Sequence, residues 1–255
     1  YYASRGLGDV YKRQILNHID VEIRNNLHVL FQPHSDVNII MGSNGSGKTT
    51  FLRNLYQSLA EDKESKDHII YLPSIDNIAL RDKRKTSNAL SQELDYYIYD
   101  MKTGPSLMSL RMSILDSSEE KRIEMKAKIA DFQKVINDFF AMTGKRIEIE
   151  GCKFTVLTDN GILPVEALSS GEKQILLILL RVFLLNGNEA IVMIDEPTYS
   201  LDIEWQFKLV TMLTHLNNKA QYFIASLSPA LFGEGWGDKV WYMDCLLYTS
   251  DAADE

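Results

Sequence analysis

The chain has 255 residues, of which 27 are Lys or Arg and 35 are Asp or Glu, and its formal net charge is −8. This acidic balance excludes a broadly basic nucleic-acid-binding protein, so any contact with nucleic acid must be local. The apolar runs are far shorter than the ~20 residues that span a bilayer, and the cysteines Cys152 and Cys245 are too few for a disulfide framework, so we expect a cytoplasmic protein.

Both ends of the chain resemble translated adapters from sequencing libraries. Residues 9–14 can be encoded by a DNA sequence whose reverse complement, read one base later, encodes residues 245–249. No physical requirement of a folded protein relates its two ends in this way. We therefore expect residues 1–14 and 245–255 to be adapter-derived and to lie outside the packed core. Residues 15–244 are then long enough for one large α/β domain or one domain with an insert.

The first elements in chain order are short strands. Residues 18–24 and 27–31 alternate in polarity. Residues 37–41, "VNIIM", form a continuous apolar run, which is typical of a strand buried on both faces. A glycine-rich loop and a helix at about 48–60 follow, and residues 68–72, "HIIYL", predict another strand.

The pattern changes over about residues 75–145, where we expect a helical insert. Asp116 and Ser117 are expected to open a long helix, because apolar residues then recur at intervals of four and three. The residues of this apolar stripe are Met125, Ile129, Phe132, Ile136 and Phe139. The stripe is too short for a coiled-coil arm, so it predicts a helical lobe that packs on the rest of the protein.

Strands and helices alternate again after the insert. A turn at residues 159–161 predicts a pair of strands, and a strongly apolar helix is expected at about 170–186. A buried strand, a helix and two more strands follow, at 190–194, about 203–217, 221–226 and 239–243. Such alternation implies an α/β fold in which helices flank a largely parallel sheet, with an N-terminal antiparallel β part.

The segment "GSNGSGKT" (residues 42–49) fits the pattern G-x-x-x-x-G-K-[ST] between a strand and a helix, which is the context of a P-loop, or Walker A motif. Its glycines would let backbone N–H groups surround phosphates at a helix N-terminus. Lys48 is expected to reach the β- and γ-phosphates of ATP, and Thr49 to bind Mg²⁺. A plain glycine turn is the alternative. The predicted nucleotide-binding residues of this loop are Gly42, Ser43, Asn44, Gly45, Ser46, Gly47, Lys48, Thr49 and Thr50.

The segment "AIVMIDEP" (residues 190–197) is an apolar strand that ends in two acids. Asp195 is predicted to hold Mg²⁺ together with Thr49, as a Walker B acid does. Glu196 is predicted to orient or deprotonate the attacking water. Solvated carboxylates at a strand end are the alternative. With Lys48, the two acids form the predicted catalytic set.

A small polar tetrad precedes the apolar helix and, taken alone, would make a good helix cap. The tetrad consists of Ser169, Ser170, Gly171 and Glu172. Its Gly171 lies 24 residues before Asp195, and "YSLD" then ends at Asp202. This order resembles the ATP-binding-cassette (ABC) superfamily over nearly all of residues 15–244. The resemblance implies a homodimer in which the exposed amides of the tetrad of one subunit meet the γ-phosphate of the ATP held by the other, with Ser169 and Gly171 at the contacting positions. It also makes Asp202 a nucleotide-binding residue.

A closer resemblance is to the soluble RecF-like and OLD-like AAA-type ATPases of DNA repair, phage defence and toxin–antitoxin loci. It is carried by "LSSGEKQ", "DEPTYSLDIEWQ" and "YFIASLSPALF". The resemblance implies an ATPase that uses ATP and Mg²⁺, closes as a nucleotide-gated dimer and drives a nuclease or other effector. Leu227 stands where this family usually has a His that senses the γ-phosphate. Leucine donates no such hydrogen bond, so we expect slow hydrolysis.

Two alternatives remain open for the function. One is the nucleotide-binding subunit of an ABC transporter, although no clear glutamine follows the strand at residues 68–72. The other is a non-hydrolysing, ATP-dependent binding module, which Leu227 favours and Glu196 opposes. The basic run "RDKRK" at residues 81–85 is a local candidate for a nucleic-acid contact, with a solvated face as the alternative.

Overall fold

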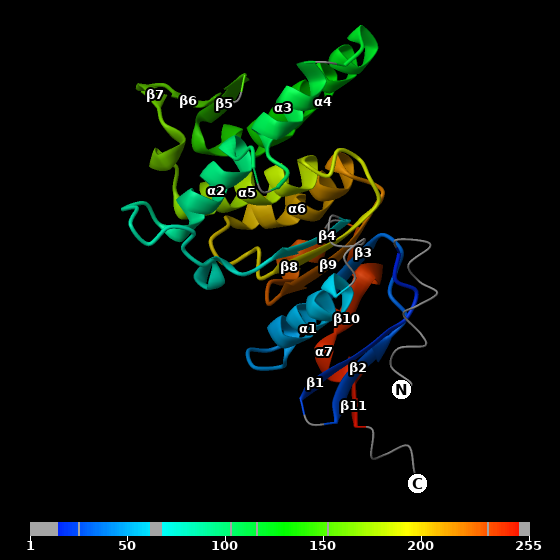
Figure 1. The fold of residues 1–255 in the computed structure, drawn as a ribbon. Helices are drawn as coiled ribbons and strands as arrows, with labels where there is room; N and C mark the ends of the chain where they lie inside the picture. Colours follow the sequence, from blue (N-terminus) through cyan, green and yellow to red (C-terminus); the bar gives the residue numbers. More distant parts are fainter. Residues whose placement is uncertain are drawn as a thin grey trace. The chain divides into compact units, whose positions relative to one another are not determined.

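The computed structural model describes residues 15–24, 26–61, 68–102, 104–115, 117–151, 153–233 and 235–249. The chain forms two compact units, of which the second is the continuous segment Asn77–Asn186 (Figure 1). The first unit combines the segments before and after it. The second unit is larger than the expected insert at 75–145, because it also contains a small sheet and the apolar helix. The predictions for residues 1–14 and 250–255 lie outside the described residues.

The main sheet of the first unit is parallel throughout the described part of the chain. Its strands follow the order β10-β3-β9-β8-β4. Their bounds are β3 Val37–Met41, β4 Ile69–Leu72, β8 Ala190–Asp195, β9 Ala220–Ser226 and β10 Val240–Tyr242. Every residue of β3, β8 and β9 is buried, as expected for central strands that are covered on both faces. The largely parallel sheet inferred from the sequence is therefore confirmed.

Helices α1 (Lys48–Ala60) and α6 (Ile203–Leu216) cover opposite faces of this sheet (Figure 1). Successive strand side chains point to opposite faces, and β9 shows the result. Phe223 belongs to the buried cluster beneath α1, whereas the Tyr222 hydroxyl donates to the carbonyl of Leu213 in α6 at 2.8 Å.

A smaller antiparallel sheet lies beside α1 and has the order β1-β2-β11. Its strands are β1 Ile19–Arg24, β2 Leu27–Phe31 and β11 Leu247–Thr249. The expectation that residues 245–255 lie outside the packed core is wrong at Leu246, which is 7% exposed and belongs to the core cluster. Burial of apolar surface is favourable whatever the origin of the segment. β11 itself is an edge strand.

The second unit contains the helices α2 Ala89–Tyr99, α3 Leu107–Leu115, α4 Glu119–Phe140 and α5 Ser170–Phe183. The predicted stripe on α4 is buried, and Phe132 stacks on Phe183 of α5 at a ring distance of 4.3 Å. The helix begins at Glu119, after Ser118, because the first-turn acids favour that start. The predicted opening at residues 116–117 is therefore too early, and Asp116 lies outside the described residues.

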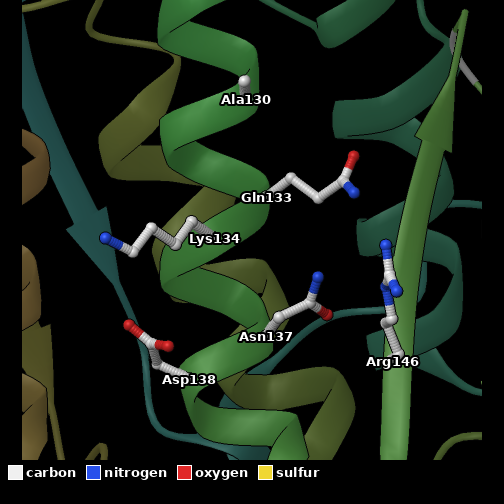
Figure 2. Close-up of a pocket in the computed structure, with 6 residues that line it drawn as sticks. All are labelled: Ala130, Gln133, Lys134, Asn137, Asp138 and Arg146. Carbon is white, nitrogen blue, oxygen red and sulfur yellow. The ribbon is translucent and has the colours of Figure 1, made fainter.

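An antiparallel sheet accompanies α4 in the second unit, with strands β5 Lys145–Glu150, β6 Lys153–Thr158 and β7 Gly161–Leu163. Gln133 and Asn137 project from α4 towards β5 (Figure 2). Asn137 bonds both the N–H and the carbonyl of Ile147, at 2.7 and 3.0 Å. A surface groove of about 350 Å³ lies beside these residues. Its other lining groups include Lys134, Asp138 and Arg146, whose mixed charge favours no single class of ligand.

The remaining elements are short helices: η3 Ile75–Asn77, η4 Ala141–Thr143, η5 Val165–Ala167, η6 Pro229–Phe232, η7 Gly237–Lys239 and α7 Met243–Leu246. No helix in the described ranges is both long and apolar enough to cross a membrane.

Candidate functional site

The P-loop connects β3 to α1 and depends on glycine at several positions. Gly45 and Gly47 have φ values of +83° and +100°, which only glycine adopts readily. A Cβ on Gly42 would lie 2.6 Å from the hydroxyl of Ser46 and 2.9 Å from Cβ of Met243. The loop backbone therefore packs too tightly for any other residue at position 42.

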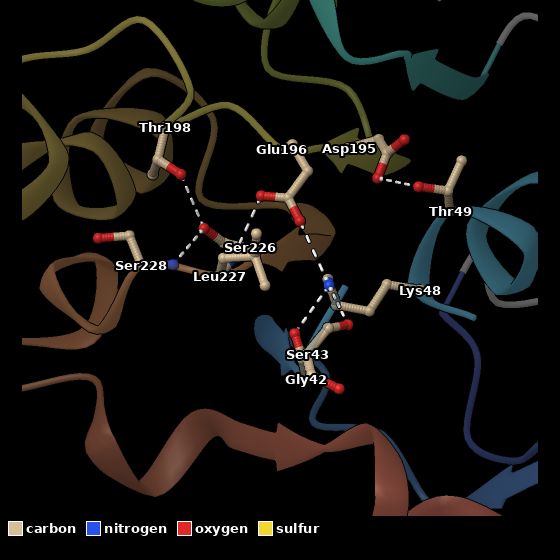
Figure 3. Close-up of polar contacts among 10 residues, drawn as sticks. All are labelled: Gly42, Ser43, Lys48, Thr49, Asp195, Glu196, Thr198, Ser226, Leu227 and Ser228. Carbon is tan, nitrogen blue, oxygen red and sulfur yellow. Dashed lines mark hydrogen bonds and ion pairs between the residues drawn. The ribbon is translucent and has the colours of Figure 1, made fainter. Parts of the chain in front are cut away.

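Backbone carbonyl groups of the P-loop hold the side chain of Lys48. The ammonium donates to the carbonyls of Gly42 and Ser43, at 2.8 and 3.2 Å (Figure 3). It also lies 3.4 Å from a carboxylate oxygen of Glu196. Lys48 is only 6% exposed, so its charge is directed into the loop rather than into bulk solvent.

Thr49 and Asp195 lie side by side at the start of α1 and the end of β8. The Thr49 hydroxyl donates to Oδ1 of Asp195 at 3.0 Å (Figure 3). Oδ2 of Asp195 is buried and has no hydrogen-bond partner among the described residues. Burial raises the pKa of this carboxyl above its ordinary value, and the nearby charge of Glu196 adds to the rise, whereas the Thr49 hydrogen bond opposes it.

These oxygens fit a magnesium ion. Mg²⁺ prefers hard oxygen ligands and commonly takes one or two from the protein, the rest coming from phosphate and water. A hydroxyl, a carboxylate and an unpartnered buried oxygen meet that description. Within the described ranges no group of three or more His, Cys, Asp or Glu residues could hold a metal ion.

Glu196 follows β8 in an unusual backbone conformation. Its φ is +46°, in the left-handed region that non-glycine residues seldom adopt. Its N–H donates to the carbonyl of Ala225 at 2.9 Å. Its carboxylate accepts a hydrogen bond from the backbone N–H of Leu227 at 3.2 Å (Figure 3). The carboxylate therefore lies between Lys48 on one side and the Leu227 amide on the other.

A hollow of about 210 Å³ brings these groups together. It is lined by Arg24, Asn44, Gly45, Gly47, Lys48, Thr49, Thr50 and Glu196. The structure thus assembles most of the predicted P-loop residues and one predicted acid around one space. Arg24 was not predicted, because it ends β1 far from the motif in sequence, and no spacing rule connects the two.

The tetrad lies in the second unit and forms a reciprocal helix cap. The Ser169 hydroxyl accepts the N–H of Glu172 at 3.2 Å, and the Glu172 carboxylate accepts the N–H of Ser169 at 2.8 Å. The amides of Ser169 and Glu172 are therefore paired within the cap and are not presented to a ligand. Ser169 and Ser170 remain exposed, and the first amides of α5, at Ser170 and Gly171, have no partner four residues back within the helix.

Glu172 is buried rather than presented to a ligand. Its side chain is 3% exposed and lies 2.7 Å from the ammonium of Lys145. Burial raises the pKa of Glu172, but the hydrogen bonds from Lys145 and from the Ser169 amide outweigh it and bring the pKa below its ordinary value. The carboxylate therefore supports the cap and β5, and its expected contact with a nucleotide is not supported.

Two other predicted features have local partners. Asp202 caps α6, because its carboxylate accepts the N–H of Glu204 at 3.1 Å, and it is exposed. In the basic run, Arg81 forms a bidentate pair with Glu93 at 2.5 and 3.0 Å. Arg84 pairs with Asp82 at 3.1 Å. Two of the basic side chains in this run are thus paired with carboxylates, and that of Arg84 is 91% exposed, which favours the solvated face over a nucleic-acid contact.

Comparison with known proteins adds independent findings. The family model described as RecF/RecN/SMC N terminal domain matches residues 15–243. A structure of an Smc head bound to the C-winged helix domain of ScpA has a TM-score of 0.52 and 13% identity, over 85% of this chain and 90% of that one. A Pyrococcus furiosus protein described as an ABC transporter ATP-binding protein has a TM-score of 0.52 and 17% identity, over 92% and 98%. These two likenesses show the fold. None of the curated proteins matches the sequence significantly.

Proposed function

The chain belongs to the RecF/RecN/SMC N-terminal domain family, and on that premise we propose that it binds Mg·ATP at the P-loop and hydrolyses it as an ABC-type ATPase. The observation that carries the proposal is the convergence of Asp195 and Glu196 on the P-loop. One carboxylate bonds Thr49 and the next lies beside Lys48. A strand that merely ended in solvated acids would not aim both of them at one loop.

Each residue then has a separate task. Lys48 binds the β- and γ-phosphates as a point charge. Thr49 and Asp195 would hold Mg²⁺, which would neutralise the negative charge that develops on the phosphates. Glu196 orients the attacking water and accepts its proton. Arg24, which lines the same hollow, adds a second positive group.

The pair between Lys48 and Glu196 must separate for this chemistry to begin. At 3.4 Å the two charges satisfy one another, whereas hydrolysis needs the lysine on phosphate and the carboxylate on water. A triphosphate carries more negative charge than one carboxylate and presents more acceptor oxygens. Binding of ATP therefore draws Lys48 away and releases Glu196 at the same moment, so that the base becomes available only beside its substrate.

We further propose that two copies of the chain close around ATP, each contributing its tetrad to the site of the other. The exposed residue Ser170, at the positive N-terminus of α5, supports this role. The related Smc head was solved with a domain of ScpA, which supports a protein partner for this chain as well. We propose that this closure of the dimer drives a nuclease or another effector of DNA repair or phage defence.

The test of hydrolysis is phosphate release at saturating Mg·ATP. Wild type should release phosphate, and Glu196→Gln should lose nearly all of that activity while still binding ATP. Glu189→Gln is the matched control, because Glu189 is exposed and only its backbone carbonyl makes a described hydrogen bond, to His68. Loss of activity in the control as well, or full activity in Glu196→Gln, would refute the assignment of the base.

A non-hydrolysing binding module is the second candidate, and the apolar, 44% exposed side chain of Leu227 favours it. In that case wild type binds Mg·ATP with ordinary affinity but releases no phosphate. The same assay therefore separates the two functions.

A further inference from the structure

A chain of buried polar side chains runs from the turn after Glu196 to the loop after β9. The hydroxyls of Thr198 and Ser226 lie 2.8 Å apart (Figure 3). Both residues are buried, with exposures of 6% and 0%. Hydroxyl groups that are removed from water in this way cost free energy unless they are paired, so the contact is a built feature of the fold.

The chain continues beyond this hydroxyl pair. The Ser226 hydroxyl accepts the N–H of Ser228 at 3.1 Å (Figure 3). The Ser228 hydroxyl donates to the side-chain oxygen of Gln206 at 2.5 Å. The Gln206 amide then donates to the carbonyl of Leu201 at 2.8 Å. The polar chain thus returns to the turn from which it started and ties both loops together.

The residue between the two anchored serines is Leu227. Its side chain is 44% exposed and contributes little to holding the loop by burial. Its N–H nevertheless points at the carboxylate of Glu196, at 3.2 Å. The position of that amide is set by the hydroxyl contacts of Ser226 on one side and of Ser228 on the other.

We infer that Thr198, Ser226, Ser228 and Gln206 are positioning residues for Glu196, acting through the backbone amide of Leu227. The inference rests on the proposed hydrolytic function. The inference explains how the chain orients the carboxylate of Glu196 although the side chain of Leu227 has no hydrogen-bond donor. The backbone N–H of Leu227 makes the hydrogen bond instead. The amide leaves the second carboxylate oxygen free to face Lys48 or water.

The variants Thr198→Val and Thr198→Ser separate positioning from packing. Valine keeps the shape of threonine but removes its hydroxyl, and it leaves the Ser226 hydroxyl without that partner. We expect kcat to fall about 10-fold, the size associated with a buried hydroxyl left unsatisfied. The KM for ATP should stay within about two-fold of wild type, because the phosphate contacts are untouched. Serine keeps the hydroxyl and should retain most of kcat.

A purely structural role predicts that both variants lower the free energy of unfolding, valine because it leaves the buried Ser226 hydroxyl unpaired and serine because it removes a buried methyl group. In that case kcat of the folded protein stays at the wild-type value in both variants. Ser228→Ala gives a second reading at a half-buried position, and kcat should again fall several-fold at constant KM. Thr214→Val is the matched control. Its hydroxyl bonds only carbonyls of its own helix, those of Val210 and Thr211, near the far end of α6.

The experiment is steady-state phosphate release with an ATP-binding isotherm for each protein. A fall in kcat for Thr198→Val and Ser228→Ala, with rescue in Thr198→Ser and no change in Thr214→Val, supports the inference. Wild-type kcat in Thr198→Val, or a loss in Thr198→Ser that exceeds the loss in Thr198→Val, overturns it and leaves the proposed hydrolysis standing. A wild-type protein that binds ATP but releases no phosphate overturns both.

Discussion

The ammonium of Lys48 lies 3.4 Å from the carboxylate of Glu196 (Figure 3), so the two groups that would meet the γ-phosphate and its attacking water face one another. The pairing predicts a different effect for the substitution of each of the two residues.

Lys48→Ala should weaken the binding of Mg·ATP by about 10- to 150-fold, because a charge-assisted contact is worth roughly 1.5–3 kcal/mol. Isothermal titration calorimetry measures the affinity. Lys219→Ala removes an exposed lysine outside the hollow and should leave the affinity unchanged. Equal ATP affinity in wild type and Lys48→Ala would refute the P-loop assignment.

Glu196→Gln should accumulate as a dimer in the presence of ATP. The amide keeps the shape of the carboxylate but cannot accept a proton from water, so the closed state persists. Light scattering after chromatography, with and without ATP, gives the mass directly.

The counterpart of this variant is Ser169→Arg, which places a long, charged side chain at the exposed N-terminus of α5. It should remain monomeric with ATP while it binds ATP as wild type does. A Glu196→Gln protein that stays monomeric at saturating ATP, or a Ser169→Arg protein that dimerises, would show that the site does not need two chains.

Leu227→His should raise the turnover of ATP. The apolar side chain of Leu227 is 44% exposed, and its backbone N–H contacts Glu196. Histidine at this position would add a hydrogen-bond donor for the γ-phosphate. Stopped-time phosphate assays at saturating ATP measure kcat. An unchanged kcat would mean that the missing side-chain donor does not limit the reaction.

Lys145→Ala should lower the free energy of unfolding by about 3 kcal/mol, because it leaves the buried carboxylate of Glu172 without its cation. Arg146→Ala is the matched control on the same strand. Its pair with Glu148 is exposed and 3.7 Å long, so that change should cost no more than about 0.5 kcal/mol. Denaturant titration of the three proteins gives the comparison, and similar losses in both variants would contradict it.

The stability of wild type relative to Asp195→Asn should fall as pH rises. Burial raises the pKa of Asp195 above the ordinary value of 3.8. The folded state therefore holds this proton more tightly than the unfolded state, and ionisation above pH 3.8 penalises folding until the raised pKa is passed. Thermal unfolding of both proteins across the acid range, without nucleotide or Mg²⁺, measures the difference. A difference that is independent of pH would contradict the assignment.

Local patterns in the sequence were enough to predict the P-loop, the strand that carries Asp195 and the buried stripe of α4. In each case the signal lies within one short segment. The motifs also predicted that Thr49 and Asp195 would meet. Contacts between distant segments outside the motifs were not predictable, because spacing along the chain does not encode them. Arg24 reaches the P-loop hollow from β1, and the Leu227 amide reaches Glu196 across 31 positions. The burial of Leu246 depends on how α7 packs against β2, which no motif specifies.

The tetrad shows a different limit. Its residue types fit both a helix cap and a phosphate contact, and the sequence alone does not separate them. In the structure the side chains of Ser169 and Glu172 are committed to the cap. This leaves the hydroxyl of Ser170 and the unused amides of the first turn as the groups that a second chain would present.

At Glu196, with its left-handed backbone, the substitutions that would stabilise the fold are also the ones that would remove the proposed base. Consecutive residues of a strand point to opposite faces, yet Asp195 and Glu196 both face the P-loop, because the chain twists at a φ of +46°. The other described non-glycine residues with positive φ are the asparagines Asn26 and Asn186, whose side chains tolerate that region. Replacement of Glu196 by asparagine or glycine would relieve the strain of the positive φ and remove the proposed catalytic base. Selection of variants for thermal stability alone would therefore favour proteins that are more stable than the wild type but no longer hydrolyse ATP.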